Sequence, residues 1–425
     1  MIQILSGTIS SGSVILVEIA IIIVFGLLLG QLAEYLNIPD VTGYLVAGLI
    51  LGPVANLFGL EILNESNFDS YNLLSNIALG FIAFQVGNEL WIGKLKKTGI
   101  KIIIITLFQA ILTVVFVVAL LLIFNQPLPL ALTLGAISAA TAPAPIMMIV
   151  KKYKTKGELT NSILPVVGLG GAVAVMILTI FLPISVSLLN SEGSLEISKI
   201  ISSPLNEIGD SILIGVILGI ITGFSLQIIS KDFEREQKNL DLVIVTIFLS
   251  TGLSIYFNAS PILTAMVAGT VTTNMINKKV YRLEENTINK FIPPLMILFF
   301  TVAGAEISFD VIYDAGIIAL IYIIGRFLGK FSGSFFGCKI TKSSKVVEKY
   351  LWISLLPQSG VAIGLASAAY ISLVNVAPDT ALIIKNVTLG SVLLFELFGP
   401  YLVRKNLIQT GEVRARRLIK KKDWY

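Results

Sequence analysis

Ser138–Val150 reads SAATAPAPIMMIV, and Ser354–Ser367 reads SLLPQSGVAIGLAS. Each stretch places proline, glycine and small polar residues inside an apolar run that is long enough to cross a membrane. Irregular backbone at membrane depth is tolerated only where it is buried in protein or lines a polar cavity. A matched pair of such breaks, one in each half of a chain, is the best sequence indication of a transporter's binding site. The two breaks therefore predict a transporter rather than an enzyme.

The composition predicts an integral membrane protein. Of the 425 residues, 55% are hydrophobic and 13% are charged, whereas a soluble globular protein carries about 25% charged residues. Apolar runs recur at about the length needed to cross a bilayer core of about 30 Å. They cover residues 13–32, 41–57, 72–93, 99–124, 128–150, 160–189, 207–230, 240–256, 260–276, 289–305, 312–338, 347–374 and 380–403. We therefore predict an all-α integral membrane protein with about 13 transmembrane helices.

Basic residues gather in alternate loops between these runs. Most of the 31 lysines and arginines lie in Lys94–Lys101, Lys151–Lys156, Lys231–Lys238, Lys278–Lys290, Lys339–Lys349 and the tail from Arg404. Because cytoplasmic loops carry the excess of basic residues, this pattern predicts an external amino terminus and a cytoplasmic carboxyl terminus. Residues 409–425 are then a basic cytoplasmic tail. The net charge of +5 belongs to loops beside anionic lipid, so the predicted partner is the bilayer and not a nucleic acid.

Several function classes lack their residues. The chain has no histidine, so it lacks the usual proton relay and any imidazole metal site. Its one cysteine, Cys338, excludes an internal disulfide. The many glycines lie in apolar runs and not in a strand–turn–helix context, so they form no nucleotide fingerprint. We predict no enzyme activity, no cofactor and no metal, and a single transmembrane transporter domain over residues 1–408.

An internal repeat organises this domain. The sequences at 87–89 and 304–306, Gly-Asn-Glu and Gly-Ala-Glu, each close an apolar run, 217 residues apart. The breaks at Pro143 and Pro357 follow them at almost the same offset, 214 residues. We predict repeat one at about 13–189, a linker helix at 207–230 and repeat two at about 240–403.

The predicted topology makes these repeats inverted. Residues 41–57 run from inside to outside, whereas their counterpart at 260–276 runs from outside to inside. In inverted repeats, two broken helices cross at the membrane midplane and form the binding site. The ends of the half-helices present partial charges to a bound ion at that crossing.

At these motifs the chain resembles the monovalent cation:proton antiporters of the Kef and Nap type, a family of sodium/proton exchangers. The matching segments are NIPDVTGYLVAGLILGP (37–53), FQVGNEL (84–90), SAATAPAPIMMIV (138–150), LPVVGLGGAVAV (164–175), GRFLGKFSG (325–333), LLPQSGVAIGLA (355–366) and FELFGP (395–400). The resemblance runs from about residue 13 to 412. It implies a homodimer, a dimerisation domain, a mobile core domain, and transport of Na⁺, K⁺ or H⁺.

One departure from the family bears on chemistry. The family's ion site lies in a run like LPVVALDDAV, or the same run with Asn-Asp, whose carboxylates bind protons and cations in competition. Here the run reads LPVVGLGGAV, so Gly170 and Gly171 stand in place of the acidic pair. Glycine has no titratable group, so the family's exchange mechanism cannot run through these positions. The glycines either allow close helix packing, as small residues do in membranes, or have a role such as widening a pore.

Lys330 matches the basic residue that faces the acidic pair in this family, and Arg326 lies one turn earlier on the same face. An unpartnered lysine in mid-membrane costs about 2.5–3.5 kcal/mol on insertion scales. Lys330 is therefore expected to find another carboxylate, to sit in water, or to lose its proton. The candidate charge partners in this region are Arg326, Glu396, Glu89 and Glu306. Glu89 and Glu306 also fit as acids that simply close a helix.

The predicted ion-site positions are Gly170, Gly171, Lys330, Thr141, Ala142, Pro143, Gln358 and Ser359. Gln109, Ser138 and other neutral side chains near the breaks either line an ion path or satisfy backbone groups that proline leaves free. The leading prediction is a cation:proton antiporter for Na⁺ or K⁺ with an altered ion site. One alternative is an uncoupled uniporter, a channel-like leak or an anion carrier, because losing the acidic pair while keeping Lys330 makes the site positive. Another is a non-transporting sensor of the same fold.

Overall fold

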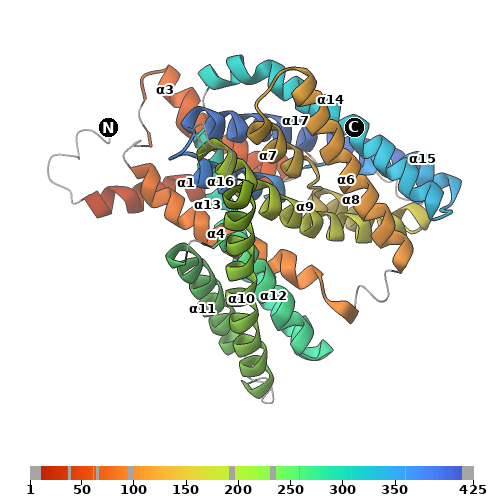
Figure 1. Ribbon diagram of the computed structural model, residues 1–425, viewed down its shortest axis with the longest axis horizontal. Helices are drawn as coiled ribbons and strands as arrows, with labels where there is room; N and C mark the ends of the chain where they lie inside the picture. Colours follow the sequence, from red (N-terminus) through yellow and green to blue (C-terminus); the bar gives the residue numbers. More distant parts are fainter. Residues whose placement is uncertain are drawn as a thin grey trace. The chain divides into compact units, whose positions relative to one another are not determined.

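The computed structural model describes residues 11–36, 40–60, 62–63, 67–93, 99–190, 197–229, 236–257, 259–307, 309–358 and 360–413. Throughout these residues the regular structure is helical (Figure 1). The chain forms two compact units. Unit 1 comprises Met1–Asn88 and Asp210–Tyr313, and unit 2 comprises Glu89–Gly209 and Asp314–Tyr425.

Unit 1 contains α1 (Ser11–Tyr35), α2 (Asp40–Leu49), the π-helical turn η1 (Ile50–Val54), α3 (Ala55–Leu57), α4 (Phe68–Glu89), α11 (Glu236–Tyr256), α12 (Pro261–Met275) and α13 (Lys278–Ala305). Unit 2 contains α6 (Ile100–Ile123), α7 (Leu128–Ser138), α8 (Pro143–Tyr153), α9 (Glu158–Asn190), α15 (Lys345–Ser354), α16 (Gly360–Leu373) and α17 (Pro378–Gln409). The long helices α10 (Ile197–Ile229) and α14 (Phe309–Ile340) contribute residues to both units.

Every apolar run predicted from the sequence coincides with a helix or with a pair of half-helices. Seven of the described helical segments are long and apolar enough to cross a membrane, and further apolar helices are shorter. The two predicted breaks are present: α7 ends at Ser138 before α8 begins, and α15 ends at Ser354 before α16 begins. The all-α membrane fold is therefore confirmed.

Two helix boundaries differ from the prediction. The linker helix α10 begins at Ile197, ten residues before the predicted start at 207. Helix α13 begins at Lys278 and so includes most of the basic segment that was expected to be a loop. Hydropathy identifies only the apolar part of a helix, and no glycine or proline interrupts α13 before Pro293. Charged residues of good helix propensity therefore continue the helix beyond its apolar part.

Glycine contacts within unit 1 reflect the internal repeat. A Cβ atom at Gly48 of α2 would meet the backbone of α13, and one at Gly304 of α13 would meet the backbone of α2. The same reciprocal contact joins Gly87 of α4 and Gly269 of α12. The sequence repeat pairs Gly48 with Gly269 and Gly87 with Gly304, so the two close crossings are equivalent under the duplication. Small residues let helix backbones approach in this way.

Helix α14 packs on α6 through glycines spaced four residues apart. Cβ atoms at Gly325, Gly333 and Gly337 would lie 3.0, 2.5 and 3.0 Å from the Cα atoms of Val117, Gln109 and Ile105, respectively. Because the contacts on α6 fall in number as those on α14 rise, the two helices run antiparallel. The offset of 217 residues makes α6 the counterpart of residues 317–340 in α14. Antiparallel counterparts are what inverted repeats require.

This packing makes a stability prediction. Gly329→Ala is expected to lower the free energy of unfolding by about 1–3 kcal/mol, because the added Cβ would overlap the Cα of Thr113 and overpack the contact. Gly316→Ala, on the same helix, is the matched control, since its Cβ would have nothing within 4 Å. Alanine favours a helix over glycine by up to about 1 kcal/mol, so the control should be neutral or stabilising. Thermal unfolding in one detergent measures both, and equal shifts would contradict the packing.

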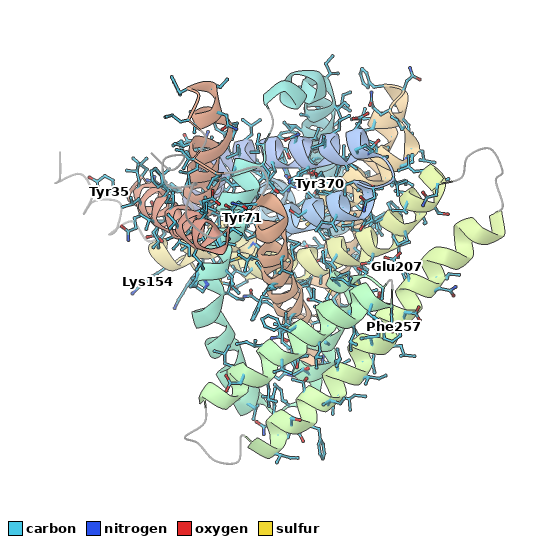
Figure 2. All side chains as sticks on the ribbon, turned by 90° about the vertical axis from the view of Figure 1, so that its left-hand side faces the viewer. Tyr35, Tyr71, Lys154, Glu207, Phe257 and Tyr370 are labelled. Carbon is cyan, nitrogen blue, oxygen red and sulfur yellow. The ribbon has the colours of Figure 1, made fainter. Side chains whose placement is uncertain are left out.

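Two buried carboxylates are held by local donors. In unit 1, Glu18 is 1% exposed, and its Oε2 accepts hydrogen bonds from Asn67 Nδ2 at 2.7 Å and from the hydroxyl of Tyr71, which Figure 2 labels. In unit 2, Glu412 accepts hydrogen bonds from the backbone nitrogens of Leu159 and Thr160 at 2.7 and 2.8 Å. Glu412 thereby caps the first turn of α9 and ties the start of the predicted tail to that helix. Residues 414–425 of the tail lie outside the described residues.

Candidate ion site

The two breaks adjoin within unit 2. The backbone nitrogen of Ala142, just before α8, donates a hydrogen bond of 3.0 Å to the carbonyl of Pro357, just before α16. Gln358 joins the same region from the second break, and its Nε2 donates to the hydroxyl of Tyr322 at 2.9 Å and to the carbonyl of Ile137 at 3.3 Å. Interrupted helices leave carbonyl groups without helical partners. The adjoining breaks therefore concentrate backbone oxygens in one place.

Arg326 of α14 binds both breaks. The side chain is fully buried, and its Nε and Nη2 donate to the carbonyls of Ser138 and Ala140 at 3.2 and 2.9 Å. Its Nη1 donates to the carbonyl of Leu356 at 2.6 Å. The guanidinium carbon also lies 4.3 Å from the ring centroid of Phe395, a cation–π distance. One planar group with several donors thus holds two breaks that are far apart in the sequence.

Lys330, one turn further along α14, is also fully buried. Its Nζ donates to Gln109 Oε1 at 2.6 Å, to the carbonyl of Ala139 at 2.7 Å and to Thr141 Oγ1 at 2.9 Å. We name these three oxygens the Lys330 cage. An ammonium group has three protons to donate, and the cage accepts all of them. Lys330 is thus held by neutral oxygens rather than by the carboxylate, water or deprotonation that the sequence alone suggested.

Gly170 of α9 faces this cage. A Cβ atom at Gly170 would lie 3.5 Å from Gln109 Nε2 and 3.8 Å from Thr141 Oγ1, which are ordinary contact distances. A Cβ at Gly171 would instead lie 3.6 Å from a methyl group of Val361 on α16. Neither position has the tight backbone contact that characterises the glycines of α14. The absence of side chains at 170 and 171 therefore leaves room rather than permitting close packing.

Most of the predicted ion-site residues come together. Gly170, Thr141 and Lys330 meet at the cage, Ala142 and Gln358 connect the breaks, Pro143 starts α8, and Gly171 lies against α16. Ser359 lies outside the described residues. The sequence predicts Gln109 only as a neutral oxygen near the breaks, although it supplies the shortest hydrogen bond to Lys330. Only its place 217 residues before Arg326, matching the repeat offset, could have singled it out.

The candidate charge partners have different positions. Glu396 is fully buried in α17, next to Phe395. Glu89 is the last residue of α4, with a side chain outside the description, and Glu306 follows the end of α13 in unit 1. The hydrogen bonds of Arg326 and Lys330 given above all go to neutral oxygens. Pairing of either cation with a carboxylate stays a prediction.

Comparison with known proteins identifies the family. Residues 5–404 match the family described as "Sodium/hydrogen exchanger, transmembrane". The chain belongs to the sodium/hydrogen exchanger family. It is therefore a multi-pass protein of a membrane transport family, and the resemblance drawn from the motifs is confirmed.

Relatives of this sodium/hydrogen exchanger family member come from an archaeon. The sequence is 29% identical over 140 residues to Na⁺/H⁺ antiporter 1 of Methanocaldococcus jannaschii, and the match spans 32% of this chain and 32% of that relative. The structure of the sodium proton antiporter MjNhaP1 from the same organism at pH 8 superposes with a TM-score of 0.72 at 21% identity, covering 92% of this chain and 98% of that one. An electron-microscopy structure of MjNhaP1 gives 0.67 at 20% identity, covering 91% and 96%. The exchanger fold thus extends over nearly the whole chain.

Proposed function

We propose that this protein exchanges a monovalent cation, Na⁺ or K⁺, for a proton across the membrane, and that Lys330 carries the proton. The observation behind the proposal is the buried ammonium of Lys330 on three neutral oxygens, at the position that Gly170 faces. Positions 170 and 171 have no carboxylate to hold a proton. Lysine gives up its proton when buried more readily than arginine, which keeps its charge. Lys330 is therefore the proton carrier at this site, and Arg326 is a fixed cation.

The charges balance for a one-to-one exchange. When Lys330 changes from an ammonium to a neutral amine, one proton leaves to water and the three oxygens of the cage lose their donors. A monovalent cation that enters the site restores the lost positive charge. Reprotonation of Lys330 then displaces the cation. One proton moves for each cation, so the exchange transfers no net charge.

A second candidate function is uncoupled movement of an ion, and it includes an anion carrier. Two buried cations, Arg326 and Lys330, lie in unit 2 one turn apart, while the acidic pair is absent at 170 and 171. A site of that sign attracts anions and repels cations. A non-transporting sensor of the same fold is a further alternative, and it predicts no ion flux.

Flux and pH recording in liposomes tests the proposal. The full chain is reconstituted, an inward Na⁺ or K⁺ gradient is imposed, and the internal pH is followed, with empty liposomes as the control. Exchange predicts alkalinisation inside the liposomes that depends on the cation gradient and persists when the membrane potential is clamped. Cation flux without a pH change indicates a uniporter or channel. Chloride flux indicates an anion carrier, and no flux indicates a sensor.

Gly170→Asp is expected to move the pH profile of exchange upward by roughly 1–3 units, because an opposite charge favours the ammonium form of Lys330. Lys330 would then release its proton only at higher pH. The new side chain fits, since its Cβ has only ordinary contacts beside Gln109 and Thr141. Gly171→Asp is the matched control, because that position faces Val361 and should shift the profile less. An unchanged profile in Gly170→Asp would contradict a proton on Lys330.

The setting of the protein is also proposed. The basic loops favour an inner membrane of a bacterium or archaeon, an external amino terminus and a cytoplasmic carboxyl terminus. By resemblance to the family, we propose a homodimer in which residues 1–408 act as one transporter domain. The exchange written above needs no cofactor and no nucleic acid.

A further inference from the structure

We propose that the Lys330 cage is itself the cation site and that it selects ions of the size of potassium, namely K⁺, Rb⁺ and NH₄⁺, over Na⁺ and Li⁺. The inference rests on the proposed function, in which Lys330 gives up a proton. It goes further by assigning the three oxygens that hold the ammonium as the ligands of the transported ion, and by deriving the selectivity from their spacing.

The cage is built around an ammonium ion. Its oxygens lie 2.6, 2.7 and 2.9 Å from Lys330 Nζ. An ammonium group and a potassium ion have nearly the same radius, whereas sodium and lithium ions are smaller. Neutral carbonyl and hydroxyl oxygens bind monovalent cations by replacing their hydration shell. A potassium ion can therefore take the place of the ammonium without moving the oxygens, but a sodium ion would require them to move closer together.

The protein resists such a contraction. The carbonyls on either side of Ala139, those of Ser138 and Ala140, are both bound by Arg326, so the backbone that presents the Ala139 oxygen is fixed from two sides. The backbone of Gln109 lies against Gly333, where a Cβ would be only 2.5 Å from the Gln109 Cα. Two of the three ligands therefore come from elements whose positions are set by other contacts.

Room beside the cage allows the exchange. Gly170 presents no side chain to Gln109 and Thr141, although a Cβ there would be accommodated at 3.5 and 3.8 Å. Gln109 Nε2 is buried and has no hydrogen-bond partner among the described residues, and it faces this room. A buried donor of this kind suits an ordered water. The room can thus hold a water with the ion, or the displaced amine of Lys330.

The cage makes proton and cation mutually exclusive. While Lys330 is an ammonium, its Nζ occupies all three oxygens and carries the charge that a cation would bring. After the proton leaves to water, the oxygens are free to accept a cation. Cation affinity must therefore rise with pH and fall again when Lys330 is protonated.

Binding of radioactive Rb⁺ to the purified full chain in detergent tests the proposal without requiring transport. Unlabelled chloride salts of K⁺, NH₄⁺, Na⁺ and Li⁺ compete at alkaline pH, with N-methylglucamine keeping the ionic strength constant. We expect K⁺ and NH₄⁺ to displace Rb⁺ at about tenfold lower concentration than Na⁺, a ratio that corresponds to about 1.4 kcal/mol. Rb⁺ binding should decline as the pH is lowered.

Thr141→Val removes one cage oxygen at nearly constant shape and should weaken Rb⁺ binding by about tenfold, or about 1.4 kcal/mol. Thr179→Val is the matched control, because Thr179 is buried on α9 and its hydroxyl donates to the carbonyl of Val175 away from the cage. A preference for Na⁺ or Li⁺, no Rb⁺ binding at alkaline pH, or equal binding by the two variants would overturn the proposal. The selectivity order of the unmodified chain decides the matter even if Thr141→Val does not fold.

The two proposals can fail separately. K⁺-selective, pH-dependent binding without cation-driven proton flux would support the cage as a cation site and contradict exchange. Proton exchange with Na⁺ in a chain that does not bind Rb⁺ would support exchange and overturn the assignment of the cage.

Discussion

Replacing Arg326 with methionine is expected to lower the free energy of unfolding by about 3–5 kcal/mol, the range seen when one partner of a buried charged group is removed. The substitution leaves the carbonyls of Ser138, Ala140 and Leu356 without the donors that now bind them. A buried polar group left without its partner costs about 1–3 kcal/mol. Methionine fills part of the volume and removes a buried charge, which offsets some of this loss. Thermal unfolding of the purified protein in one detergent measures the effect.

Two variants make this result specific. Arg326→Lys should restore little stability, because one ammonium cannot reproduce the planar set of donors that reaches both breaks. Arg404→Met is the matched control: Arg404 is partly buried on α17, and its guanidinium lies 5.3 Å from the ring of Tyr153. A cation–π contact of that kind is worth about 0.5–1 kcal/mol. If Arg326→Met proved as stable as Arg404→Met, Arg326 would not hold the breaks together.

Lys330→Met is expected to reduce cation-driven proton flux in liposomes to the level of empty liposomes. The variant keeps a side chain of similar length but has no group that binds a proton. With no ammonium in the cage, Rb⁺ binding should persist and lose its dependence on pH. The first measurement tests the proton carrier, and the second tests the competition for the cage.

The charge-retaining substitution gives the opposite binding result. Lys330→Arg should also stop exchange, because a guanidinium does not release its proton in a protein, but its permanent charge should block Rb⁺ binding at every pH. Lys339→Met removes an exposed lysine from the last turn of the same helix and should leave exchange unchanged. Persistent exchange in Lys330→Met would transfer the proton to another buried acid. Loss of that remaining exchange on adding Glu396→Gln would then identify Glu396.

Hydropathy and charge in the sequence determine where the helices lie. A run of apolar residues of membrane length requires a helix, because no other segment satisfies its backbone in lipid, and each predicted run is helical. The same signal misplaced the starts of α10 and α13, since hydropathy does not detect the polar turns that extend a helix. The glycines of α14 show a spacing of four in the sequence, but that α6 packs on them follows only from the structure.

The sequence by itself also determined the chemistry at the site: two proline breaks, a buried lysine and arginine, and glycines where relatives carry acids. It could not determine what holds Lys330. Periodicity relates residues within a few turns of one helix, whereas Gln109 and Lys330 are 221 residues apart. Only the packing of α6 against α14, together with the break that Arg326 fixes, places three neutral oxygens within hydrogen-bond distance of one ammonium group. Hydrogen bonds depend on separations in space, and tertiary structure alone sets those separations.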